Sequence, residues 1–151
     1  MIRSIVLAVA AVCALGAGAA VAQPPATPTA APETGCTQPL DACTKARTAA
    51  LKTQARKFTA AARMKPATTL TAEERAKVQA YDRWLRAQSQ KARDLAERGT
   101  AATTAEIQTA FNREYMQLQQ GMQREHRQFE QISNIMKSKH DAARSAIGNV
   151  R

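Results

Sequence analysis

The chain has 151 residues, of which 22 are Lys or Arg and 12 are Asp or Glu, giving a formal net charge of +10 at pH 7. Such a length is typical of one domain, and the basic excess favours solubility and anionic partners without specifying a fold. Its six glycines and few loops leave little from which to build an enzyme pocket, so we expect a protein that is not an enzyme.

The first 22 residues have the pattern of a signal peptide. A short basic start precedes an apolar run from Ile5 to Leu15, and Ala20 and Ala22 are the small residues that signal peptidase reads. We therefore predict a periplasmic or secreted bacterial protein, cleaved near Ala22. The alternatives are a membrane anchor, for which the run is short, and a lipoprotein modified at Cys13.

Residues 23–36 form a predicted disordered leader, because four prolines and no large apolar side chain lie between residues 23 and 35. Cleavage would leave two cysteines, Cys36 and Cys43, and an even number in an oxidising compartment indicates a disulfide. Within one helix these cysteines would be roughly 10 Å apart, too far to bond. We therefore place Cys36 in a loop that folds back, with an intermolecular disulfide as the alternative.

Residues 37–151 form the predicted helical domain. Its first helix, from about Pro39 to Met64, has a core face of Leu40, Leu51, Ala55, Phe58 and Ala62. The other side carries a stripe about 40° wide, here called the basic stripe, which consists of Lys45, Lys52, Arg56 and Arg63. No acidic residue lies between residues 42 and 66, against seven Lys and Arg. A merely solubilising surface would mix signs, so the basic stripe is a candidate anion-binding surface; the alternative is a solvated face without a ligand.

The second helix begins at a capping box formed by Thr71 and Glu74. We expect it to run to Arg98 and to stop at Gly99. Its predicted buried face consists of Val78, Tyr81, Trp84, Leu85, Ala92 and Leu95. Trp84 is the only tryptophan and should be the largest side chain of the core.

A second capping box, Thr103 to Glu106, opens the longest stretch without proline. From Ile107 to Val150 the apolar residues fall within a stripe roughly 80° wide, and several recur every eleven residues, which predicts a straight or weakly coiled helix. As one helix, residues 103–147 would extend about 65 Å, roughly 25 Å more than either shorter helix. The predicted fold is all-α, an antiparallel three-helix bundle or helical hairpin with a long, overhanging C-terminal helix.

The overhanging end carries apolar residues that a polar tail would lack: Ile132, Ile135, Met136, Ile147 and Val150. An isolated apolar helix face in water needs a cover. We therefore predict that these residues bind a second copy of the chain or another envelope protein. The alternative is that the helix breaks near Gly121 or Ser138 and folds back.

Two further pairs of residues are candidates for metal binding or catalysis. His126 and His140 would lie roughly 21 Å apart along one helix, too far to share a metal ion, so we expect neither a metal site nor a cofactor. Glu114 and Glu125 lie inside the apolar stripe, and buried charges are generally paired, so each should meet a basic residue, such as Arg47 or Lys65 on the first helix; the alternative is a catalytic role. The chain also lacks a glycine-rich phosphate loop and a Gly-x-Ser-x-Gly turn.

The sequence supports two functional hypotheses. The first is an envelope binding or scaffold protein, such as a chaperone, adaptor or assembly subunit, that acts through the amphipathic C-terminal helix. The second is an anion-binding or membrane-surface-binding protein that acts through the basic stripe. Nucleic acid is the less favoured anion, because no aromatic residue interleaves the basic stripe to stack on bases.

Overall fold

The computed structural model describes residues 35–66 and 68–148, and over these residues it contains α-helices and no strand. The predicted all-α class is therefore confirmed. The predicted signal peptide, the leader as far as residue 34 and Val150 lie outside the described residues.

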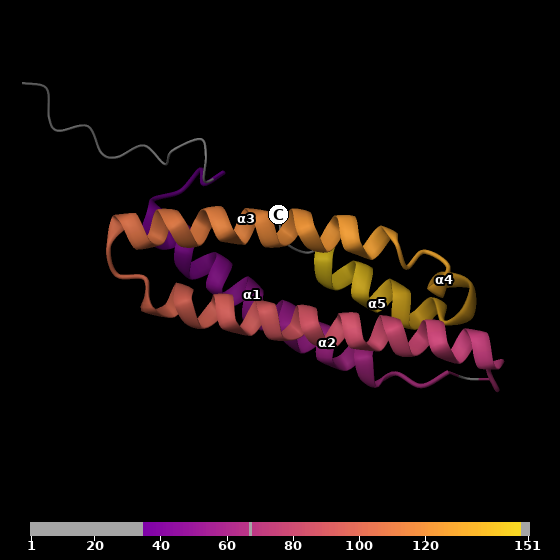
Figure 1. Ribbon diagram of the computed structural model, residues 1–151. Helices are drawn as coiled ribbons and strands as arrows, with labels where there is room; N and C mark the ends of the chain where they lie inside the picture. Colours follow the sequence, from indigo (N-terminus) through magenta and orange to yellow (C-terminus); the bar gives the residue numbers. More distant parts are fainter. Residues whose placement is uncertain (1–34, 67, 149–151) are drawn as a thin grey trace, which may run out of the picture.

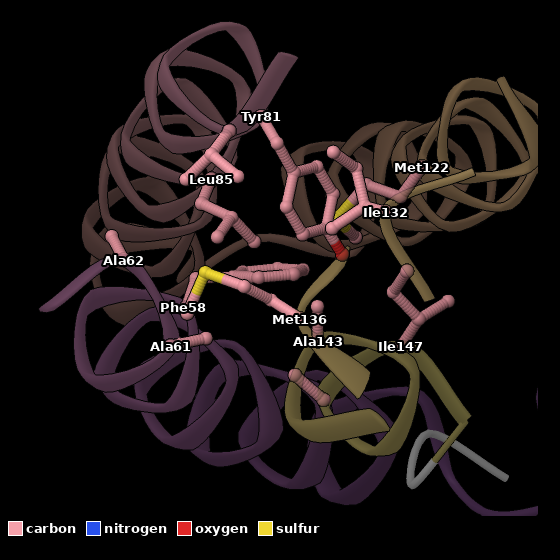
Figure 2. Close-up of a cluster of buried hydrophobic side chains, with 12 residues drawn as sticks. Phe58, Ala61, Ala62, Tyr81, Leu85, Met122, Ile132, Met136, Ala143 and Ile147 are labelled. Carbon is pink, nitrogen blue, oxygen red and sulfur yellow. The ribbon is translucent and has the colours of Figure 1, made fainter. Parts of the chain in front are cut away.

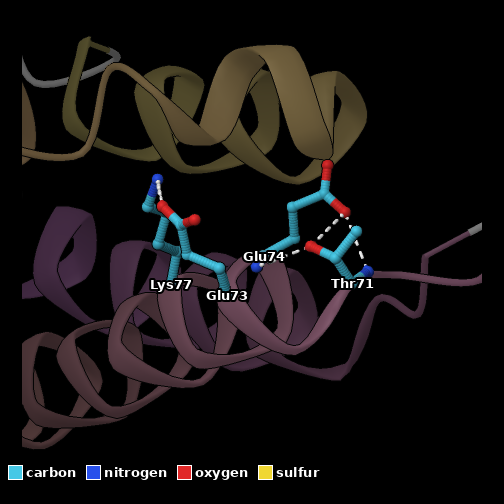
Figure 3. A network of polar contacts seen from close by, with 4 residues as sticks. All are labelled: Thr71, Glu73, Glu74 and Lys77. Carbon is cyan, nitrogen blue, oxygen red and sulfur yellow. Dashed lines mark hydrogen bonds and ion pairs between the residues drawn. The ribbon is translucent and has the colours of Figure 1, made fainter.

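Helices α1 (Leu40–Arg63) and α2 (Ala72–Ala101) form a long hairpin (Figure 1). α1 ends just before Lys65 and Pro66, where the residue preceding a proline disfavours helical dihedrals. α2 begins at the predicted capping box: the Thr71 hydroxyl accepts from the Glu74 amide at 3.2 Å, and the Glu74 carboxylate accepts from the Thr71 amide at 2.9 Å (Figure 3). These bonds satisfy amide donors that have no partner inside the helix.

Gly99 does not stop α2, which continues for two more residues to Ala101. A Cβ atom built at Gly99 would lie 2.3 Å from Thr48 Oγ1 and 2.5 Å from Phe111 Cε2. Real Cβ atoms essentially never approach that closely, so the glycine is required by packing. Its missing side chain lets three helices meet at this end of the hairpin.

The predicted intramolecular pairing of the two cysteines is present, with the Sγ atoms of Cys36 and Cys43 2.10 Å apart and their Cα atoms separated by 6.1 Å. Cys36 lies before α1 and Cys43 lies in its first turn, so the segment folds back as expected. Gly35 adopts a positive φ of 60°, a conformation that glycine adopts without steric cost, and its carbonyl accepts from Arg47 at 3.3 Å.

Helix α3 (Ala105–Arg127) returns along the hairpin. Its N-cap is Thr104 rather than the predicted Thr103, and the Thr104 hydroxyl accepts from the Ile107 amide at 3.4 Å. The difference is one residue, because two successive threonines offer the same capping chemistry.

The prediction of one continuous, overhanging C-terminal helix is wrong. The chain turns after Arg127, forms the single-turn helix α4 (Ile132–Ile135), and breaks again at Met136, where φ is −143° and ψ is 71°. Helix α5 (Lys137–Gly148) then runs back and packs against α1 and α3 (Figure 1). The overhang is therefore absent from the described part of the chain.

The physical reason for the break is burial. α1 and α2 present apolar side chains at the end where α3 leaves, and the returning segment covers them with buried side chains that include Ile132, Met136, Ala143 and Ile147 (Figure 2). Within the turn, the amides of Gln128, Phe129 and Glu130 still bond carbonyls three residues back. Few backbone hydrogen bonds are lost, whereas each large apolar side chain contributes about 1.5–3 kcal/mol on burial.

Buried side chains gather in two clusters at opposite ends of the hairpin. The disulfide-end cluster consists of Leu51, Ala55, Ala92, Leu95, Ala96, Phe111 and Tyr115. The α5-end cluster consists of Phe58, Ala61, Ala62, Val78, Tyr81, Leu85, Met122, Ile132, Met136, Ala143, Ala146 and Ile147. Trp84 is only half-buried and packs at the margin of the α5-end cluster, so the expectation that it is the largest side chain of the buried core is wrong; Tyr81 is the largest fully buried side chain among the described residues.

Candidate functional site

The basic stripe lies on the solvent side of α1, as predicted. All four of its side chains are exposed, whereas Leu51 and Phe58 on the inner side of the helix are completely buried. Lys45 contacts Asp41 one turn away, at 3.7 Å. Within residues 35–66 and 68–148, the other three members form no ion pair with a carboxylate.

At its C-terminal end the basic stripe borders a groove between α1 and α2, here called the arginine groove. The groove has a volume of about 350 Å³ and is lined by Thr59, Ala62, Arg63, Arg86, Ser89, Gln90 and Arg93. Three guanidinium groups thus gather at one place, one from α1 and two from α2. We call the basic stripe together with Arg86 and Arg93 the basic face.

Hydroxyl groups connect the two helices in this groove. The Oγ atoms of Thr59 and Ser89 lie 2.9 Å apart, and each is also within 3.0 Å of the Ala55 carbonyl oxygen. Arg93 Nη2 donates to Thr59 Oγ1 at 2.9 Å. This bond holds the Arg93 guanidinium over the groove while its other N–H donors remain available.

The charge of the arginine groove is poorly balanced. Among the described residues, neither Arg63 nor Arg86 forms an ion pair, and no carboxylate lines the groove. The nearest acidic residues that follow Arg93 on α2 are Asp94, which accepts from Gln90 Nε2 at 2.7 Å, and the exposed Glu97. Gathering like charges costs free energy unless an anion neutralises them.

The arginine groove has the chemistry of a binding site. Its guanidinium groups supply hydrogen-bond donors for an oxyanion. Its lining contains no histidine, cysteine or carboxylate that would act as a nucleophile or general base.

The residues predicted to bind a partner lie elsewhere, and mostly inside the protein. Ile132, Met136 and Ile147 retain 2%, 4% and 6% of their exposure because α5 folds back onto α1. Ile135 is half-buried and packs against the same cluster. The prediction that these residues form an uncovered surface is wrong for this structure, and Val150 lies outside the described residues.

The fold also brings the two histidines together, so the expected separation is wrong. The rings of His126 and His140 have centroids 4.6 Å apart, because they come from opposite sides of the α3–α5 turn. His126 Nε2 lies 3.0 Å from the Tyr81 hydroxyl. Burial, then the neighbouring His140 and then Arg144, lower the pKa of His126 from 6.5 to about 4.

Glu114 and Glu125 do find basic partners, but on α2 instead of the first helix. Arg98 Nη1 lies 2.6 Å from Glu114, and Lys91 Nζ lies 3.9 Å from Glu125. Glu125 also accepts from the indole N–H of Trp84 at 2.7 Å. α3 is thus joined to α2 by polar contacts along one edge.

Sequence reasoning missed the α2 half of the basic face. Arg86 and Arg93 are seven residues apart, so they share one side of a helix. Within α2 alone, the same side of the helix also carries acidic residues, so the sequence of α2 does not show a purely basic side. The antiparallel register that places Thr59 beside Ser89 also brings Arg63 and Arg86 to the same groove, and this register was not known from the sequence.

Among the described residues, no group of three or more His, Cys, Asp or Glu side chains is arranged to hold a metal ion. The described helices include none with the length and apolar content needed to cross a membrane. Comparison with protein-family models, with curated proteins and with solved structures found no match to this chain.

Proposed function

We propose that this protein is a non-enzymatic binding protein whose basic face attaches it to an anionic bilayer surface. The observation that carries the proposal is the gathering of exposed basic side chains from α1 and α2, of which only Lys45 is paired with a carboxylate among the described residues. A basic side chain near an anionic membrane surface contributes about 1 kcal/mol to attachment. Several basic side chains on one rigid face therefore contribute together to the free energy of attachment.

The shape of the basic face favours a flat surface as the ligand. From Lys45 to Arg63 the basic stripe extends about 27 Å along one straight helix, so its charges meet many head groups at once. No aromatic side chain of α1 interrupts the stripe to stack on nucleic-acid bases. Secretion, proposed from residues 1–22, would bring the face to the lipids of a bacterial envelope.

A scaffold role through the C-terminal helix has less support. It required an uncovered apolar face, and three of its five residues are buried within the α5-end cluster. The basic face needs no such opening, because its side chains already lie at the surface.

The proposal is tested by charge reversal outside the arginine groove. Lys52→Glu combined with Arg56→Glu should weaken co-sedimentation with vesicles containing an anionic phospholipid by about thirtyfold or more, because two attractive charges of about 1 kcal/mol each are lost. Both side chains are exposed and point away from the core, so circular dichroism should show unchanged helicity.

The matched control is Arg124→Glu with Arg127→Glu, the same charge change at two exposed positions of α3. It should weaken vesicle binding far less than the α1 pair. Equal weakening by both pairs, or a wild-type protein that ignores anionic vesicles at low salt, would refute the proposed role of the basic face.

A further inference from the structure

We propose that the arginine groove is a phosphate-binding site, and that it makes the basic face prefer phosphate-bearing head groups to carboxylate-bearing ones. This inference rests on the proposed function and adds a ligand class to it. Its basis is the meeting of Arg63, Arg86 and Arg93 around one groove that has a hydroxyl pair between the helices.

The donor arrangement suits a tetrahedral oxyanion. Each guanidinium presents a planar fork of N–H donors that matches phosphate or carboxylate oxygens in pairs. A carboxylate has two oxygens and is satisfied by one fork. A phosphomonoester group has three terminal oxygens pointing in different directions, so it can accept from guanidiniums on both α1 and α2 at once.

The groove is partly pre-organised for this ligand. Arg93 is already held by Thr59 at 2.9 Å, and the Thr59 hydroxyl is in turn fixed on the Ala55 carbonyl at 3.0 Å. Less side-chain freedom is therefore lost when the anion binds. A volume of about 350 Å³ is at the small end of ligand sites, which fits a head group better than a large molecule.

Charge also favours phosphate. Three guanidiniums line the groove, and its lining has no carboxylate. A phosphomonoester carries up to two negative charges and neutralises more of this excess than a singly charged carboxylate. The mutual repulsion of the arginines is relieved when the site is filled.

The test compares two kinds of vesicle matched for zeta potential, one containing phosphatidic acid and the other a long-chain fatty acid. The readout is the ratio of the two binding constants, in which general electrostatic attraction cancels. For the full chain we expect about a tenfold preference for phosphatidic acid, because charge-assisted paired hydrogen bonds are the strong ones. Arg86→Gln with Arg93→Gln should reduce the ratio to about one.

The control is Arg124→Gln with Arg127→Gln, which removes the same charge from α3 and should keep the preference. If the groove variant lowers binding to both vesicles equally, the phosphate site is wrong although attachment through the basic face stands. If the wild type binds neither vesicle, the proposed function itself fails. Circular dichroism and thermal unfolding of each variant exclude misfolding as the cause.

A second arm identifies the source of the phosphate. Inorganic phosphate is titrated into the protein on phosphatidic acid vesicles, against sulfate-free chloride at equal ionic strength. Selective displacement shows that the phosphate group alone fills the groove. Retained binding, together with the loss in the groove variant, assigns the site to a phosphate presented by a lipid. No preference for phosphate in either arm overturns the inference.

Discussion

The two ends of the α1–α2 hairpin are closed in different ways. At the disulfide end, Gly99 permits direct contact between helices, with Phe111 and Thr48 pressed against the glycine backbone. At the other end, the returning α5 brings buried polar groups into the core, including Lys139 and His140, and the His140 ring lies beside that of His126 on α3. The first closure has a close-packed glycine contact, whereas the second has a buried ion pair and a histidine pair.

This difference indicates where the protein is most sensitive to its surroundings. Shape-based packing responds little to pH or salt, but a buried cation or imidazole is stable only with its partners in place. Lys139 is 1% exposed, and its Nζ lies 2.5 Å from Asp82 Oδ1 and 3.5 Å from the Ala62 carbonyl oxygen. The α5 end should therefore open first.

The largest expected effect follows from removing this buried ion pair. Asp82→Ala should lower the free energy of unfolding by about 3–5 kcal/mol, because the Lys139 ammonium is left without its counter-charge in the core. Urea unfolding followed by circular dichroism measures the change.

The control is Asp141→Ala, which breaks the exposed ion pair between Asp141 and Lys137 at 3.1 Å on the same helix. Exposed pairs contribute about 0–1 kcal/mol. Similar losses from Asp82→Ala and Asp141→Ala would mean that Lys139 does not hold α5 in place.

A smaller effect tests the disulfide end. Gly99→Ala should cost about 1–3 kcal/mol, because the added methyl overfills the contact with Thr48 and Phe111. Gly121→Ala is the matched change in α3, where nothing lies within 4 Å of the added atom, and it should stabilise the protein by up to about 1 kcal/mol. If both substitutions stabilise, the close approach at Gly99 is not required.

The smallest effect is a pH dependence confined to the α5 end. The pKa of His126 is about 4 in the folded protein, below its ordinary value of 6.5. Between these values the unfolded chain binds more protons than the folded one, so stability falls as the pH decreases through this window. His126 faces Tyr81, His140 and Arg144, and the latter two oppose a positive charge there.

Thermal unfolding at about pH 7.5 and about pH 5 should reveal a loss of about 1 kcal/mol in the wild type, after allowance for partial solvent access. His126→Gln retains an amide that can bond the Tyr81 hydroxyl but has no proton to gain. Its stability should change less between the two pH values. An equal loss in both proteins would place the titrating group elsewhere.

The sequence was informative wherever the signal is local. The capping box at Thr71, the end of α1 before Pro66 and the pairing of Cys36 with Cys43 each depend on residues within one or two turns. The outward direction of the basic stripe was also predictable, because helical periodicity alone separates it from Leu51.

The fold of the C-terminal third was not predictable in the same way. Periodicity continues through Phe129 and Met136 as if the helix were unbroken, because both halves place apolar residues at helical spacing. Whether such a stretch stays straight depends on what the other helices leave uncovered. The arginine groove could not be predicted for the same reason, because Arg63 and Arg86 are brought to one groove only when α1 and α2 pack together.

Trp84 makes the contact between α2 and the C-terminal end of α3 visible to fluorescence spectroscopy. Its ring stacks on Tyr81 at 5.5 Å, lies 5.7 Å from His126 and bonds Glu125 through the indole nitrogen. The chain has one tryptophan, so the tryptophan fluorescence of the protein reports on this contact alone. Separation of α5 and α3 from α2 would move the indole into water and shift that emission to longer wavelength.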